Sequence, residues 1–178
     1  QYQLHEAWTW EHQALVRARP LSGSHQLSND FIAVRKHILS QVRNSASVKQ
    51  DVVKMREKMR HQLASKPNAD GQTLKFHLKH DEGGIVDIEF MVQYGVLAYA
   101  HQCQALLSYT DNIRILDAFE KQLILSTSDA HDLREAYQKM RAAEHRLTLQ
   151  NKAGEVSVDD LQEHRSKVKN IWAATMMS

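Results

Sequence analysis

The sequence predicts an all-α protein, a bundle of about six or seven helices around a central buried helix at residues 85–101. Two observations support this prediction. Apolar residues recur three and four positions apart along nearly the whole chain, which is the spacing of one helix face. Only six glycines and two prolines interrupt the 178 residues. Hydrophobic residues make up 42% of the chain, enough for one sizeable core, so we expect residues 1–178 to form a single helical domain.

Two helices are predicted before residue 45. The first covers about residues 4–19, because the ring and the missing N–H of Pro20 disfavour its continuation. Ser28 is placed to cap the second helix. Apolar residues at helical spacing predict that this helix buries one face, formed by Phe31, Val34, Ile38 and Val42.

The third helix has the clearest amphipathic pattern. Ser47 and Gln50 have the spacing of a capping box and predict its start. Its apolar stripe consists of Val48, Val52, Met55, Met59 and Leu63. The pattern breaks at residues 66–71, and apolar and polar residues then alternate. This alternation predicts a short extended segment near residues 73–79.

The second half of the chain is predicted to be helical to its end. The helix at residues 85–101 is apolar almost all round, as a buried helix should be. Further helices are expected at about residues 111–123 and from Ser126 or Ser128 to about residue 151. Ser157, with Asp160 three residues later, predicts the start of the last helix.

Composition argues against several classes of protein. The formal net charge is only +2, so no field of one sign favours nucleic acid or a membrane as a partner. The single cysteine, Cys103, excludes an internal disulfide and fits a cytoplasmic location. Acidic residues interrupt the longest apolar run, residues 85–100, which is shorter than the roughly 20 residues of a membrane helix. No signal peptide is expected either.

Aromatic and basic residues gather in the first predicted helix. Trp8 and Trp10 lie about 200° apart around a helix axis, so a single contact surface cannot cover both rings. Either the helix is sandwiched within its own bundle, or one face meets another domain. Arg17 and Arg19 can neutralise phosphate or pair with carboxylates.

A second group of polar residues surrounds the start of the central helix. Glu89 lies on an apolar stripe, where a carboxylate needs a partner such as Lys79 or Arg17. Its role is either a structural pair or a carboxylate oriented toward a cleft. Asp87 is near the helix start, where the helix dipole favours negative charge. The pair at residues 83–84, Gly-Gly, can expose backbone N–H groups to an anion.

Other charged clusters receive less specific interpretations. Five basic residues of the third helix predict a solvated face or a surface for an acidic partner: Lys49, Lys54, Arg56, Lys58 and Arg60. His77, His80, Asp81 and Glu82 lack the paired spacing of a zinc site, so we expect no metal site. Nucleophile and phosphate-loop motifs are absent from the sequence.

Two segments resemble a known family. Residues 7–20 (AWTWEHQALVRARP) and 83–94 (GGIVDIEFMVQY) are similar to the helical region of glutamine synthetase adenylyltransferases, and residues 55–60 (MREKMR) also fit. The resemblance is specific to about residue 100 and looser afterwards. In the related uridylyltransferases of the PII signal protein, Gly-Gly-Leu-Arg-Asp stands at this place. Val86 argues against that branch.

The resemblance implies an enzyme with two fused copies of one unit. Each copy has a nucleotidyltransferase domain of the DNA polymerase β type followed by a helical domain. One copy removes AMP from glutamine synthetase, and the other, C-terminal copy transfers AMP from ATP to a tyrosine of that protein. This chain resembles the helical domain of the attaching copy, which controls nitrogen assimilation.

The resemblance also sets expectations for the site. The aspartates that hold Mg²⁺ and ATP would lie in the missing upstream domain, so we expect no catalytic residue, metal or cofactor in this chain, and no transfer by it alone. Expected partners are glutamine synthetase, the PII signal protein and the parent's own nucleotidyltransferase domain. The expected cleft-facing or interdomain residues are Trp10, Glu11, His12, Arg17, Arg19, Lys79, Gly83, Gly84, Asp87 and Glu89.

Two alternatives to this function stay open. In the first, the chain is an autonomous binding module for PII or for glutamine. In the second, it is the helical domain of the related PII uridylyltransferase.

Overall fold

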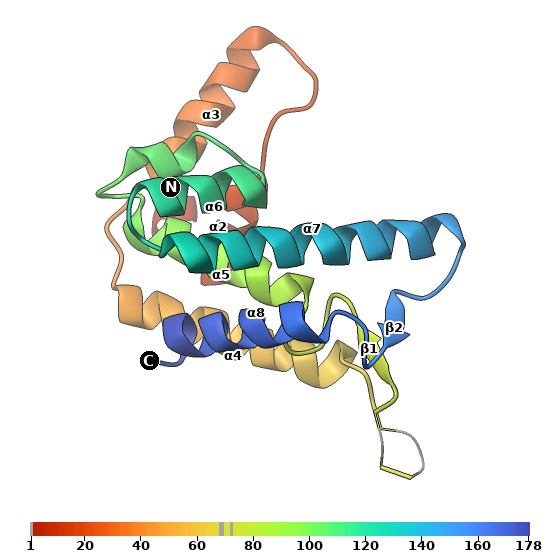
Figure 1. The fold of residues 1–178 in the computed structure, drawn as a ribbon. Coiled ribbons are helices and arrows are strands. Elements are labelled where there is room, and N and C mark those ends of the chain that lie inside the picture. Colours follow the sequence, from red (N-terminus) through yellow and green to blue (C-terminus); the bar gives the residue numbers. More distant parts are fainter. Residues whose placement is uncertain (1, 68–69, 72) are drawn as a thin grey trace. The chain divides into compact units, whose positions relative to one another are not determined.

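A computed structural model describes residues 2–67, 70–71 and 73–178, and it confirms the predicted all-α class (Figure 1). The elements, in order, are α1 (Tyr2–His5), α2 (Thr9–Arg17), α3 (His25–Leu39), α4 (Ser45–Leu63), β1 (Lys75–His77), α5 (Ile85–Tyr99), the 3₁₀ helix η1 (Gln104–Leu107), α6 (Asn112–Lys121), α7 (Thr127–Leu149), β2 (Glu155–Ser157) and α8 (Gln162–Met176).

The chain forms two compact units. The first unit combines the residues up to Val52 with residues 92–125, and the second combines residues 53–91 with residues 126–178. The boundaries fall within α4 and α5, so each of these helices contributes residues to both units. That residues 1–178 form one domain stays a prediction.

A buried arginine connects three elements of the first unit. Arg35 on α3 is only 4% exposed. Its guanidinium donates to the carbonyl oxygens of Leu15 and Val16 at 2.9 and 2.6 Å, and to that of Leu107 at 3.0 Å. These bonds satisfy the ends of α2 and η1, which have no intrahelical partner for their last carbonyls.

The predicted helices of the first unit need correction at their ends. The first predicted helix is interrupted at residues 6–8 and ends at Arg17. Ser24 caps α3 in place of Ser28, because its side chain accepts the Leu27 N–H at 3.2 Å. The predicted apolar face of this helix was only partly right: Ile38 is buried, whereas Val34 is exposed and Val42 is exposed beyond the end of α3.

The start of α4 was also misplaced. Asn44, rather than Ser47, supplies the cap, because its side-chain oxygen accepts the Ser47 N–H at 3.0 Å. Of the predicted stripe on this helix, Val48 and Val52 are buried and Leu63 is exposed. The predicted break that follows α4 includes residues 68–69, which lie outside the described residues.

The second unit contains the predicted extended segment and a strand that the sequence analysis missed. β1 pairs with β2 in antiparallel register, with Phe76 opposite Val156. Phe76 is fully buried, and the Arg165 guanidinium lies 3.8 Å from the centre of its ring. The last helix does not begin at Ser157. The Asp160 side chain accepts the Ser157 N–H at 3.1 Å in a turn, and α8 begins at Gln162.

The helices of the middle of the chain are confirmed. α5 is buried along nearly its whole length, as the apolar sequence predicts. Asp111 caps α6, and Ser126 caps α7 by accepting the Asp129 N–H at 3.0 Å. α7 packs beside α8 within the second unit. Within the described ranges, no helix combines the length and apolarity needed to cross a bilayer.

Candidate functional site

The predicted site residues fall into two groups, one in each unit. Trp10, Glu11, His12, Arg17 and Arg19 lie on or just after α2 in the first unit. The remaining predicted residues belong to the second unit, namely Lys79, Gly83, Gly84, Asp87 and Glu89.

Two tryptophans of the first unit are exposed. Trp8 is 69% exposed and Trp10 is 52% exposed. Trp8 is the N-cap of α2 and precedes its first turn. The prediction that both tryptophans lie within one helix was therefore wrong. The interpretation that the helix is sandwiched within its own bundle was wrong. Arg17 and Arg19 are also exposed.

Glu11 and His12 interact with backbone groups of the residues that precede α2. The Glu11 carboxylate accepts the Trp8 N–H at 2.8 Å and the Tyr2 hydroxyl at 3.0 Å. Nε2 of His12 lies 2.8 Å from the Gln3 carbonyl oxygen. Burial lowers the pKa of His12, which favours the neutral ring. Both residues therefore set the geometry of α2 and present Trp8 and Trp10 outward.

The most deeply buried charges of the second unit are Arg56 and Asp87, with 0% and 1% exposure. Nε of Arg56 lies 2.5 Å from Oδ1 of Asp87. Arg60 donates to the same oxygen at 3.1 Å, and the Gly83 N–H donates to Oδ2 at 2.7 Å. Asp87 thus joins α4 to the first turn of α5. Its predicted position at the helix start is confirmed.

The guanidinium groups of α4 are only partly satisfied. Nη2 of Arg56 donates to the carbonyl oxygen of His80 at 2.8 Å, but Nη1 of Arg56 and Nε of Arg60 are buried and make no hydrogen bond within the described chain. Burial lowers the pKa of Arg56, and the Asp87 carboxylate opposes this shift. Arginine remains charged in spite of such shifts. Donors in this state have bonding capacity left for a ligand or water.

These residues border a pocket of about 320 Å³. It is lined by Val53, Arg56, Glu57, Arg60, Glu82, Asp87, Lys169, Trp172, Ala173 and Met177. The lining contains charges of both signs and one aromatic ring, that of Trp172. Such a pocket can hold a small molecule that carries both charges.

Glu89 and Lys79 have separate partners. Glu89 is half-buried, and the Tyr137 hydroxyl donates to its Oε1 at 3.2 Å. Lys79 forms an ion pair with Glu144, with 2.6 Å between Nζ and Oε1. The expectation that Glu89 needs a polar partner is confirmed, and Tyr137 was not foreseen as that partner.

The N–H groups of the Gly-Gly pair are occupied by groups of the chain itself rather than exposed to an external anion. The Gly83 N–H donates to Asp87, and the Gly84 N–H donates to the Asp81 carbonyl at 3.0 Å. Gly83 has a φ of +78°, and a Cβ there would lie 2.5 Å from the Arg165 carbonyl oxygen. Glycine is required here by backbone conformation and close packing.

One charged cluster differs from its predicted role, and the acidic residues of a second have partners within the fold. Arg56 is buried, so the basic residues of α4 do not form one solvated face. Asp81 accepts the N–H groups of Ser65 and His77, both at 2.7 Å, and Glu82 pairs with Arg60 at 3.1 Å. The two carboxylates among residues 77–82 therefore form hydrogen bonds and an ion pair within the fold.

Comparison with known proteins decides the family. The model of glutamate-ammonia ligase adenylyltransferase matches residues 1–34, and the model of GlnD PII-uridylyltransferase matches residues 53–174. The bifunctional glutamine synthetase adenylyltransferase/adenylyl-removing enzyme of Pseudomonas aeruginosa is 49% identical over 96% of the chain. The chain belongs to the glutamine synthetase adenylyltransferase family. Relatives of the same name from Pseudomonas syringae and Hahella chejuensis are 47% and 46% identical over 99% and 97% of the chain.

The chain spans a small part of the length of its relatives. It covers 18% of the length of the Pseudomonas aeruginosa protein and 19% of that from Pseudomonas syringae. The match to the uridylyltransferase model covers the second unit and part of the first, whereas the match to the adenylyltransferase model covers α1, α2 and the start of α3. The exposed Trp8 and Trp10 therefore lie in the segment matched by the adenylyltransferase model.

Proposed function

We propose that this chain is the helical domain that follows a nucleotidyltransferase domain in a cytoplasmic enzyme that attaches AMP to glutamine synthetase. The observation that carries the proposal is the 49% identity to the Pseudomonas aeruginosa enzyme over 96% of the chain. In this proposal the whole enzyme transfers AMP from ATP to a tyrosine of glutamine synthetase and thereby regulates nitrogen assimilation.

The predicted site residue Asp87 does not suit a magnesium–ATP site. Asp87 is buried and already accepts from Arg56, Arg60 and the Gly83 N–H. A magnesium ion needs carboxylate oxygens that keep room for water and phosphate. We therefore assign Mg²⁺ and ATP to the nucleotidyltransferase domain, and we propose that the isolated chain does not transfer AMP.

We assign to the first unit the surface that contacts the nucleotidyltransferase domain. Exposed aromatic rings are costly in water and are enriched at interfaces. Trp8 and Trp10 supply the apolar part of this surface, and Arg17 and Arg19 supply positive charge. The segment that carries all four residues matches the adenylyltransferase family model, which supports an adenylyltransferase-specific contact.

The test uses the intact enzyme. Replacing Trp10→Ala is expected to lower kcat/KM for AMP transfer to glutamine synthetase about tenfold, because loss of one well-packed aromatic contact costs on the order of 1–2 kcal/mol. The matched control is Leu149→Ala, which removes an exposed apolar side chain of α7. Incorporation of radiolabelled AMP measures the rate. Equal rates for the two variants would reject the contact surface.

The pocket of the second unit supports a second candidate, an autonomous binding module. Its combination of guanidinium and carboxylate groups suits the zwitterion of an amino acid such as glutamine. The matched uridylyltransferase family is also named for the PII protein. Calorimetric titration of the chain with glutamine and with PII separates the candidates, since tight binding without the upstream domain favours the module.

A further inference from the structure

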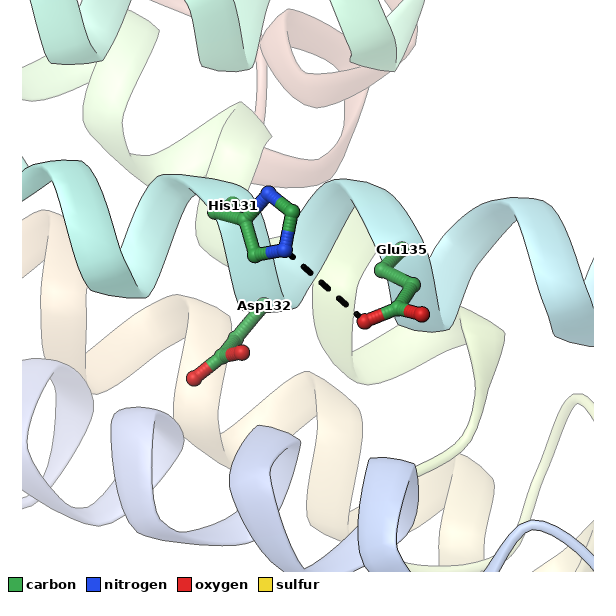
Figure 2. A group of neighbouring side chains, drawn as sticks. All are labelled: His131, Asp132 and Glu135. Carbon is green, nitrogen blue, oxygen red and sulfur yellow. Dashed lines mark ion pairs between the residues drawn. The ribbon is translucent and has the colours of Figure 1, made fainter.

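A cluster of potential metal ligands lies on α7, on the side that faces α8. His131 and Glu135 are four positions apart, and Asp132 is three positions before Glu135, so all three side chains leave one face of the helix (Figure 2). Their ligand atoms lie within 4.8 Å of one another. In a tetrahedral zinc site, ligand atoms about 2.0–2.2 Å from the ion lie roughly 3.3–3.6 Å apart. Side-chain rotations on the helix surface would bring the three ligand atoms to this spacing.

A fourth candidate ligand, His164, lies on α8, which packs beside α7. Nε2 of His164 lies 3.7 Å from Oε1 of Glu135, and Nε2 of His131 lies 3.9 Å from Oε2 of the same carboxylate. Both separations are too long for a hydrogen bond. Two imidazoles from different helices thus lie near the Glu135 carboxylate without forming a hydrogen bond to it.

The electrostatic surroundings permit a cation. Asp132 pairs with Lys167, with 3.0 Å between Oδ1 and Nζ, and Lys167 also pairs with Glu163 at 3.1 Å. The Lys167 ammonium can therefore lose its ion pair with Asp132 and retain the one with Glu163. The side chain of Lys167 is 36% exposed, so it can move away without losing its contact with water.

We propose that His131, Asp132, Glu135 and His164 form a zinc site that joins α7 to α8. Two imidazoles and two carboxylates suit Zn²⁺, whereas Mg²⁺ prefers oxygen ligands and water. The ion would close the gap between the helices and stabilise the folded second unit, because a ligand that binds only the folded state adds to its stability. No metal site was expected from the sequence, in which only residues 77–82 stood out as possible ligands.

The experiment uses the full 178-residue chain, treated with chelator and carrying Cys103→Ser so that the free thiol binds no zinc. Zinc chloride is titrated by calorimetry into this chain and into His131→Ala and His164→Ala variants. The matched control is His145→Ala, which removes an exposed histidine of α7 outside the cluster. Each variant is first checked for helical circular dichroism and for a cooperative thermal transition.

The proposal predicts saturable binding of one zinc ion per chain, weakened about tenfold or more by either His131→Ala or His164→Ala and unchanged by His145→Ala. Zinc should also raise the unfolding temperature of the parent chain, and magnesium should not. Absence of saturable binding overturns the site. Unchanged affinity in the His164→Ala variant overturns the bridge between α7 and α8, and the four-ligand site with it.

Discussion

Arg56 shows how a single buried charge organises the second unit. Arg56 is 0% exposed, so protein groups must replace much of its hydration, and Asp87 and the His80 carbonyl do so. The sequence contained a signal for this role, because Arg56 lies four positions after the buried Val52 on the inward face of α4. Sequence reasoning assigned it to a solvated face because five basic residues crowd the same helix.

Removal of the partner charge should be strongly destabilising. Asp87→Ala leaves Arg56 buried without its counter-ion, and we expect the free energy of unfolding to fall by about 3–5 kcal/mol. Urea denaturation measures this change. Lys75→Ala serves as the control, because it breaks an exposed pair with Glu155 whose loss should cost no more than about 1 kcal/mol. Similar losses in both variants would contradict the buried-pair interpretation.

His80 should make stability depend on pH. Its Nδ1 is buried without a hydrogen-bond partner in the described chain, and burial lowers its pKa, helped by the nearby charges of His77, Arg56 and Lys79. The unfolded chain therefore binds a proton more readily than the folded chain. The stabilising contribution is complete above the unfolded pKa of about 6.5 and is lost as the pH falls through the folded value.

Urea denaturation at several pH values between 7.5 and 5 tests this dependence. Replacing His80→Gln should flatten the decline of the unfolding free energy below pH about 6.5, because the group that gains a proton on unfolding is gone. His145→Gln is the matched control, since His145 is exposed. The effect of His80 is absent if both variants follow the parent curve. His12, whose pKa burial also lowers, contributes in the same direction and accounts for a residual slope.

At the scale of elements, local signals predicted the helices of the middle of the chain well. Asp111 and Ser126 are strong caps followed by helical periodicity, and both cap helices in the structure. β2 could not be foreseen in this way, because its three residues form a strand only by pairing with β1, which lies far away in the sequence. The face of α3 was only partly predicted, because a charged residue, Arg35, is buried on this helix together with Ile38 and Leu39.

Gly95 sets the approach of α5 to α6 in the first unit. A Cβ at this position would lie 2.5 Å from Cζ of Phe119, whose ring is buried. Alanine favours an isolated helix over glycine by about 1 kcal/mol. We expect Gly95→Ala to be destabilising nevertheless, by about 1–3 kcal/mol, because the buried ring has little room to retreat.

A double-mutant cycle with Phe119→Leu checks the cause of this effect by urea denaturation. The smaller side chain should make Gly95→Ala less costly than it is beside phenylalanine, which gives a favourable coupling energy between the two sites. If Gly95→Ala stabilises the chain, helix propensity outweighs the steric contact and the prediction is wrong.

At the scale of the whole chain, the candidate site was only partly predictable. The family motifs pointed to Trp10 and to Asp87, and the structure shows that one is exposed and the other is sealed by Arg56. Exposure and burial depend on contacts between segments that no local pattern encodes. The metal cluster combines a local signal, His131 and Glu135 at helical spacing, with a nonlocal one, His164 on α8.

The three tryptophans differ in exposure and can therefore report on the proposed contact between α2 and the nucleotidyltransferase domain. Trp8 and Trp10 are largely exposed, whereas Trp172 is 8% exposed. Hydroxyl-radical footprinting read by mass spectrometry should therefore oxidise Trp8 and Trp10 readily in the 178-residue chain and Trp172 little. In the intact enzyme, oxidation of Trp10 should fall several-fold, because a ring buried in an interface core is shielded from solvent.

Leu149 provides the internal reference for this comparison, because it is exposed in the chain and lies outside the proposed contact surface. Its oxidation should be similar in the chain and in the intact enzyme, so that a general loss of reactivity is distinguished from local protection. If Trp8 and Trp10 are oxidised equally in both proteins, the α2 surface does not contact the nucleotidyltransferase domain. Its exposed rings would then remain available to a separate partner protein, which repeating the footprint with glutamine synthetase bound identifies directly.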